Sequence, residues 1–175
     1  AMRKRYELKM EVLGPEGHHV QEVRVLNRII RWTADGLEYE PDQRHADRVV
    51  KDLGLQKSKP VATPCTSDIL DKFKIGLGQE LDNNQASVYR WIAARVNYLA
   101  ADRSDLQYAS NKASKYMAKP TRRGLEVLKR IGRYLHGSPR LVQIFPLSSM
   151  DHTRLHGFAD SDWAGDKTNM KSTTG

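Results

Sequence analysis

Cysteine is nearly missing from this sequence: Cys65 is the only one in 175 residues. A single thiol excludes an internal disulfide and any zinc site built from several cysteines, and this scarcity is typical of proteins in a reducing compartment. Cys65 follows a proline and has no activating base beside it in the sequence. We therefore do not expect a cysteine nucleophile.

Long apolar runs are missing as well. No stretch approaches the roughly 20 consecutive apolar residues that a membrane-spanning helix needs. The first residues include Arg3, Lys4 and Arg5 but no apolar segment after them, so we expect no signal peptide. These features lead us to expect an intracellular protein of the cytoplasm or nucleus that has no membrane partner.

Several familiar ligand-binding patterns are also missing. The sequence has no Gly-Lys-Ser/Thr loop for phosphates, no glycine-rich dinucleotide turn, and no His-x-x-x-His pair with a partner acid. His18 and His19 fall in an expected turn, and we interpret all six histidines as structural or exposed.

Positive charge, in contrast, is abundant. Lys and Arg number 29 against 21 Asp and Glu, which gives a formal net charge of +8. Between Lys112 and Arg140, nine cations accompany one anion, Glu126, so this stretch carries an excess equal to that of the whole chain. Such a balance favours polyanionic partners, nucleic acid first.

Alternating apolar residues predict a small antiparallel β-meander over residues 5–40. Its expected strands are residues 5–13, residues 23–32 with a bulge near Leu26, and a short return at 37–39. Asp35-Gly36 supplies the positive φ that a tight hairpin turn needs.

Helical spacing of apolar residues follows this meander. The expected segments are a helix between Asp42 and Gly54, an extended connector at 57–64, a mobile linker at 65–83, helices from near 85, 105 (capped by Ser104-Asp105) and 121, and paired strands at 141–145 and 153–158. The fold is therefore expected to be α+β: an N-terminal antiparallel β-meander plus helix, a helical connection, and a truncated β-hairpin.

The helix at 121–136 is one candidate binding surface. Its apolar residues recur on one side, and the other side carries Arg122, Arg123, Lys129, Arg130 and Arg133. These cations could neutralise phosphates along a nucleic-acid backbone. A solvated helix face explains the same pattern, and the residues alone leave the two interpretations equally open.

The helix that starts near residue 85 carries two aromatic residues, Trp91 and Tyr98, which lie seven positions apart. They could share one face of that helix. We expect them to pack in the core rather than to stack on bases, because aromatic stripes on helices usually pack.

The second candidate site is Asp160-Ser-Asp162, at the end of the last expected strand. On an extended backbone both carboxylates point to the same face. Mg²⁺ prefers such hard oxygen ligands. The spacing alone, however, favours a strand end with two solvated aspartates.

A series of motifs runs along nearly the whole chain. They are Gln43-Arg-His-Ala46 with Lys59-Pro-Val-Ala-Thr-Pro64, Tyr89-Arg-Trp-Ile-Ala-Ala-Arg-Val-Asn-Tyr-Leu99 with Asp102-Arg-Ser-Asp-Leu-Gln-Tyr-Ala109, Leu128-Lys-Arg-Ile-Gly-Arg-Tyr-Leu-His-Gly137, and Asp160-Ser-Asp-Trp-Ala-Gly-Asp166 with Lys171-Ser-Thr-Thr-Gly175. These motifs resemble the Pol polyprotein of copia-type LTR retrotransposons. Ser104 stands where the family usually has proline. Each motif alone is weak, but their order and spacing together are strong.

The resemblance implies four parts: the end of a reverse transcriptase palm and thumb at 1–64, a linker at 65–83, a helical connection at 84–139, and the incomplete start of a ribonuclease H-like domain at 140–175. By this match Asp160 is the first catalytic, metal-binding carboxylate and Asp162 a helper ligand, with Mg²⁺ as the cofactor of the complete parent. The basic helix would lie along an RNA–DNA hybrid or other duplex, with the rest of the Pol polyprotein as a further partner.

Departures from the family limit the activity we expect. The parent would be an RNA-directed DNA polymerase with ribonuclease H activity, but this sequence lacks the Tyr-x-Asp-Asp turn and most of the nuclease acids. Two-metal hydrolysis cannot be supported by one or two carboxylates. The resemblance thus implies a fragment that is inactive alone. The open alternative is a non-catalytic basic nucleic-acid-binding protein derived from such an element.

Overall fold

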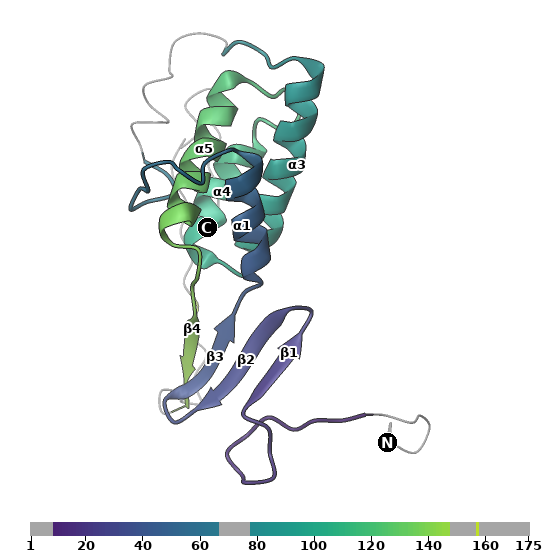
Figure 1. Ribbon diagram of the computed structural model, residues 1–175, viewed down its shortest axis with the longest axis vertical. Coiled ribbons are helices and arrows are strands. Elements are labelled where there is room, and N and C mark those ends of the chain that lie inside the picture. The colour runs from purple at the N-terminus through teal and green to yellow at the C-terminus, as the bar shows by residue number, and fades with distance from the viewer. Residues whose placement is uncertain (1–8, 67–77, 148–156, 158–175) are drawn as a thin grey trace. The chain divides into compact units, whose positions relative to one another are not determined.

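The computed structural model describes residues 9–66, 78–147 and 157 of the chain (Figure 1). Contacts divide the chain into two units, Ala1–Phe145 and Pro146–Gly175, and nearly all the described residues belong to the first. Its described residues form a four-stranded sheet and four α-helices, which confirms the α+β fold.

The sheet has the strand order β1-β2-β3-β4. The strands are β1 (Glu22–Val25), β2 (Arg28–Thr33), β3 (Gly36–Glu40) and β4 (Gln143–Pro146). β1 with β2 and β2 with β3 are antiparallel pairs. Thr33 pairs with Gly36, so the chain turns at Ala34-Asp35 where a hairpin was predicted, although only Gly36, with a φ of 144°, supplies a positive φ.

The bulge expected near Leu26 was wrong. Leu26 and Asn27 have φ angles of 50° and 64°, and Val25 pairs directly with Arg28. Two successive residues with positive φ are the signature of the type I′ turn, whose twist suits a two-residue hairpin. One long expected strand is therefore two strands joined by a turn.

The first expected strand, 5–13, was also wrong in its described part. Residues 9–12 have no regular structure, and Leu13 forms only an isolated bridge with Val20. Met10 and Val12 are 54% and 45% exposed. Their alternation has no core to face, so the physical basis for a strand is lacking.

The rest of the first unit consists mainly of four α-helices, which lie close to one another in Figure 1. They are α1 (Gln43–Asp52), α3 (Asn83–Ala100), α4 (Gln107–Ser114), which follows the 3₁₀ turn η2 (Ser104–Leu106), and α5 (Arg122–Gly137). The side chains of Asp42, Asp82 and Thr121 accept hydrogen bonds from the first-turn backbone N–H groups, as N-caps do. Gly54, with a φ of 67°, follows α1 as expected for a helix C-terminus.

One hydrophobic core joins these helices. Val49 of α1, Ile92 and Val96 of α3, Ala109 of α4 and Ile131 of α5 are all at most 1% exposed. The predicted division placed α1 and the later helices in different parts, whereas the structure buries their apolar sides in one core. The names given to those parts stay predictions.

The end of the expected mobile linker is held in place where it is described. The Leu81 N–H donates to the Pro120 carbonyl, and the Arg122 N–H donates to the Gln79 carbonyl, both at 3.0 Å. Residues 67–77 lie outside the described residues. The strand expected at 141–145 is β4, which neighbours β3, and its expected partner at 153–158 lies outside the described residues apart from Gly157.

We find no helix among the described residues whose length and apolar character would let it cross a bilayer.

Candidate nucleic-acid interface

Helix α5 buries one side and presents its cations on the other. The buried residues are Gly124, Val127, Leu128, Ile131, Gly132 and Leu135. At about 100° per residue, the five predicted cations fall within roughly 120° of the helix circumference. They are Arg122, Arg123, Lys129, Arg130 and Arg133, of which Arg122 is exposed and the others are half-buried. The structure therefore brings these five residues together on one side.

The connector that follows α1 crosses part of this basic side. Arg133 Nε donates to the Lys59 carbonyl oxygen at 2.8 Å, and Arg130 Nη2 donates to Thr63 Oγ1 at 2.9 Å. Both acceptors are neutral oxygens, so these contacts orient the guanidinium groups without compensating their charge. A Cβ at Gly137 would lie 2.7 Å from Pro60 Cβ, so the connector depends on glycine for this close approach.

Lys129 differs from these arginines because it has an anionic partner. Its Nζ lies 2.8 Å from Glu126 Oε1, and the two side chains are 42% and 52% exposed. Exposed pairs of this kind contribute little to stability and are easily exchanged for another anion. Lys129 can therefore still turn to a phosphate.

Arg103, which sequence reasoning did not single out, fixes the end of α5. It is 1% exposed. Its guanidinium donates to both carboxylate oxygens of Asp105, at 2.9 and 2.7 Å, and to the carbonyls of Ser138 and Pro139, at 3.1 and 3.2 Å. Burial disfavours the charged form, but the bonds to Asp105 outweigh it, so the pKa of Arg103 is raised.

The expected capping of α4 by Ser104-Asp105 was wrong for this reason. Ser104 lies within η2, and no side-chain cap bond starts either η2 or α4. Asp105 instead binds Arg103 and accepts a 2.7 Å hydrogen bond from Tyr134 Oη on α5. Burial opposes ionisation of Asp105, but these hydrogen bonds prevail and lower its pKa.

The neighbouring Asp102 links the sheet to the helices. Arg28 Nε of β2 and Tyr39 Oη of β3 donate to its two carboxylate oxygens at 2.8 and 2.7 Å. Gln143 Nε2 of β4 donates to its carbonyl at 2.7 Å. The motif Asp102-Arg-Ser-Asp105 is thus the corner at which the sheet, α3 and the end of α5 meet.

The prediction that Trp91 and Tyr98 pack in the core was wrong. They are 44% and 48% exposed. The Arg95 guanidinium lies 4.2 Å from the centre of the Trp91 ring, Arg48 lies 5.9 Å from it, and Arg28 lies 5.5 Å from the Tyr98 ring. Cation–π pairs of this kind form at exposed sites, so these rings have packing partners outside the core.

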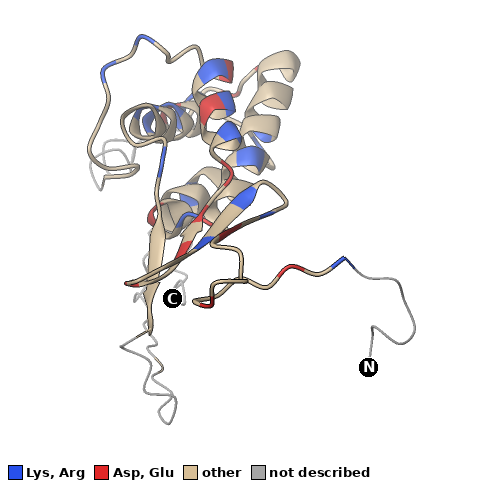
Figure 2. Cartoon of the chain, turned by 60° about the horizontal axis from the view of Figure 1, so that its bottom comes forward, with Lys and Arg blue, Asp and Glu red and all other residues tan. Residues whose placement is uncertain are grey.

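Charge is spread widely over the described chain. Figure 2 shows Lys and Arg on the strands as well as on the helices, with Asp and Glu among them. What distinguishes α5 is its local excess of cations, because Glu126 is its only acid. Asp160 and Asp162, the predicted catalytic and metal-binding residues, lie outside the described residues, so their geometry stays a prediction.

Cys65 lies near α5 but shows no sign of activation. Burial raises the pKa of its thiol. A raised pKa keeps the thiol protonated and therefore a poor nucleophile. This agrees with the expectation from the sequence.

Comparisons with known proteins identify several relatives of this chain. No family model and no solved structure matches it. The retrovirus-related Pol polyprotein from transposon RE1 of Arabidopsis thaliana is 38% identical over 128 residues, which are 73% of this chain and 9% of that protein. The corresponding polyprotein from transposon RE2 of the same plant is 41% identical over 118 residues, 67% of this chain and 8% of that protein.

A third relative matches nearly the whole chain. The retrovirus-related Pol polyprotein from transposon TNT 1-94 of Nicotiana tabacum is 28% identical over 169 residues, 95% of this chain and 12% of that protein. The chain thus spans only 8–12% of the length of these relatives. The resemblance stated from the motifs is confirmed, and this chain belongs to the family of retrovirus-related Pol polyproteins of copia-type transposons.

Proposed function

We propose that this chain is part of the reverse transcriptase and ribonuclease H region of a Pol polyprotein, and that α5 contacts the backbone of a duplex such as an RNA–DNA hybrid. The observation that carries the proposal is the basic side of α5: five cations lie together there, opposite a buried apolar side. The relatives support membership of a Pol polyprotein, and the assignment to a region within it rests on the motifs.

The geometry of α5 suits a duplex backbone. Its 16 residues make a rod about 24 Å long, which can follow several successive phosphates. Duplexes that contain RNA are bound mostly through shape and backbone rather than base edges. Two of its cations, Arg130 and Arg133, are oriented by neutral oxygens, so they offer charge to a phosphate without a base-reading pattern.

The binding should depend steeply on salt. For a hybrid duplex, we expect the logarithm of the association constant to fall with the logarithm of salt concentration, with a slope of up to about 4–5 in magnitude if all five cations meet phosphates. The double variant Arg122→Gln/Lys129→Gln should weaken binding and reduce the slope by about 0.9 for each phosphate that is no longer neutralised. Fluorescence anisotropy across a salt series measures both quantities.

A matched pair elsewhere on the chain provides the control. Arg24 in β1 and Lys51 in α1 are exposed. The variant Arg24→Gln/Lys51→Gln removes the same charge but should leave the slope near that of the wild type. Equal losses in both double variants would show that only net charge matters and would contradict an interface on α5.

We also expect this chain to have no nuclease activity on its own. Asp160 and Asp162 are the carboxylates proposed to bind Mg²⁺, and two-metal cleavage needs further acids. Incubation with a labelled RNA–DNA hybrid and Mg²⁺ should leave the RNA intact. Cleavage that requires Mg²⁺ and vanishes in Asp160→Asn would show that this expectation is wrong.

A further inference from the structure

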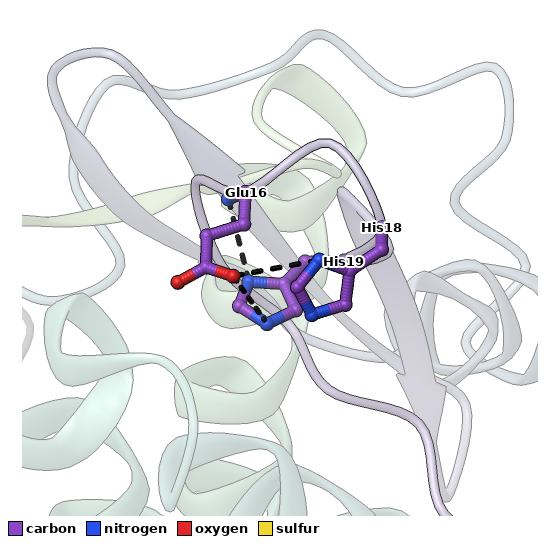
Figure 3. A group of neighbouring side chains, drawn as sticks. All are labelled: Glu16, His18 and His19. Carbon is purple, nitrogen blue, oxygen red and sulfur yellow. Dashed lines mark hydrogen bonds and ion pairs between the residues drawn. The ribbon is translucent and has the colours of Figure 1, made fainter.

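The turn before β1 gathers three potential metal ligands. Glu16, His18 and His19 each offer one ligand atom, and these atoms all lie within 4.8 Å of one another. Figure 3 shows both imidazole rings beside the Glu16 carboxylate. The turn has its own framework, because Leu13 bridges to Val20 and the Gln21 side chain donates to the Gly14 carbonyl at 3.0 Å.

The spacing of these atoms is close to that of a metal site. Glu16 Oε2 lies 3.4 Å from His18 Nδ1 and 3.8 Å from His19 Nε2. Zinc bonds of about 2.0–2.2 Å in a tetrahedron separate neighbouring ligand atoms by roughly 3.3 Å. Small rotations of the exposed Glu16 and His18 side chains therefore bring all three donors into range.

Gly14 makes the position of His19 possible. A Cβ on Gly14 would lie 2.6 Å from His19 Nδ1, so the imidazole rests where any other residue would project. The His19 side chain is only 15% exposed, whereas that of His18 is 75% exposed. One imidazole is thus held in place, and the other is free to close on an ion.

We propose that this turn binds a divalent transition-metal ion such as Zn²⁺ through Glu16, His18 and His19. Two imidazole nitrogens and one carboxylate are ligands that such ions accept, and water completes the tetrahedron. Mg²⁺ is a poor occupant, since it prefers oxygen ligands. The site is distinct from the α5 surface and independent of the proposed function.

Binding requires one rearrangement within the turn. The Glu16 N–H donates to His19 Nδ1 at 3.3 Å, which places the ring proton on Nε2. Coordination through Nε2 needs that nitrogen unprotonated, so the proton moves to Nδ1 and this long hydrogen bond breaks. The Glu16 amide therefore reports on occupancy of the site.

The experiment is a calorimetric titration of the full chain with ZnCl₂, repeated in excess Mg²⁺. His152 and His156 are further imidazoles outside the described residues, so the same titration is run on His152→Ala/His156→Ala, which should keep the site. His18→Ala, His19→Ala and Glu16→Gln should each lower the affinity at least about tenfold, since even indirect changes around a metal cost that much. The amide signal of Glu16 should shift with Zn²⁺.

Two glycine variants separate the geometry of the site from its chemistry. Gly14→Ala removes no ligand but displaces His19, and it should weaken binding. Gly17→Ala, whose Cβ would meet nothing within 4 Å, should not. His19→Ala could unfold the turn itself. His18 is exposed, so His18→Ala removes a ligand without disturbing the turn and still tests whether the site binds Zn²⁺. Unchanged Zn²⁺ affinity in His18→Ala/His19→Ala, or loss of all binding in His152→Ala/His156→Ala, would overturn the proposal.

Discussion

Replacing Arg103 with leucine is expected to destabilise the fold by about 3–5 kcal/mol, the usual cost of removing one partner from a buried ion pair. The guanidinium is almost completely buried, and its loss removes two hydrogen bonds to Asp105 and one to each of the Ser138 and Pro139 carbonyls, leaving Asp105 with the bond from Tyr134. The leucine cannot replace four directed hydrogen bonds. Urea unfolding followed by circular dichroism measures the free energy.

Two variants bound the interpretation of this result. Arg103→Lys keeps the charge but not the planar fork, so it should recover only part of the stability. Arg122→Leu, at an exposed site, should change the free energy of unfolding by no more than about 0.5 kcal/mol. A loss below about 1 kcal/mol in Arg103→Leu would mean that the corner between α3 and α5 does not depend on this ion pair.

Glu40→Gln is expected to cost roughly 1.5–3 kcal/mol at neutral pH, the range for hydrogen bonds to charged groups. Glu40 is 7% exposed and accepts bonds from Arg140 at 2.7 and 3.0 Å and from Arg31 at 2.8 Å. Glutamine keeps the shape but loses the charge. The loss should appear in the same urea experiment.

The cost should also depend on pH. Hydrogen bonds from Arg140 and Arg31 outweigh burial and lower the pKa of Glu40 from 4.5 to about 2. A carboxyl whose pKa is lower in the folded state stabilises the fold above its unfolded pKa, and this contribution disappears as the pH falls from about 4.5 towards 2.

The difference in the free energy of unfolding between wild type and Glu40→Gln should therefore be largest at pH 7 and small near pH 2. Glu38→Gln serves as the control, because Glu38 lies 3.7 Å from Arg31 and is more exposed. A difference for Glu40→Gln that does not change with pH would refute the role assigned to its charge.

Features that depend on neighbouring residues could be predicted from the sequence. The apolar stripe of α5, the caps Asp42 and Thr121, and the turn before Gly36 all follow from short-range spacing and turn chemistry. The five cations of α5 were placed on one side by the same helical period. Short-range patterns are enough for these features because the residues that form each cap, turn or helical stripe lie within about four positions of one another.

Features that depend on distant residues could not be predicted in this way. Arg28 and Asp102 are 74 positions apart, and no local pattern indicates their pairing. The exposure of Trp91 could have been inferred, since Tyr89, Ile92, Val96 and Leu99 already complete the buried stripe of α3. The sequence did not indicate a metal site at His18 and His19, because two adjacent histidines do not have the His-x-x-x-His spacing of a helical metal site.

The pairing of Arg140 with Glu40 spans 100 positions, and this has a consequence for how the chain is made. Synthesis delivers the β2–β3 hairpin before the helices, and such a hairpin can form within microseconds. Its buried carboxylate must then wait for the further 100 residues that bring Arg140. Contacts between such distant residues slow folding, so we expect the joining of sheet and helices to be the slowest step in the folding of this unit.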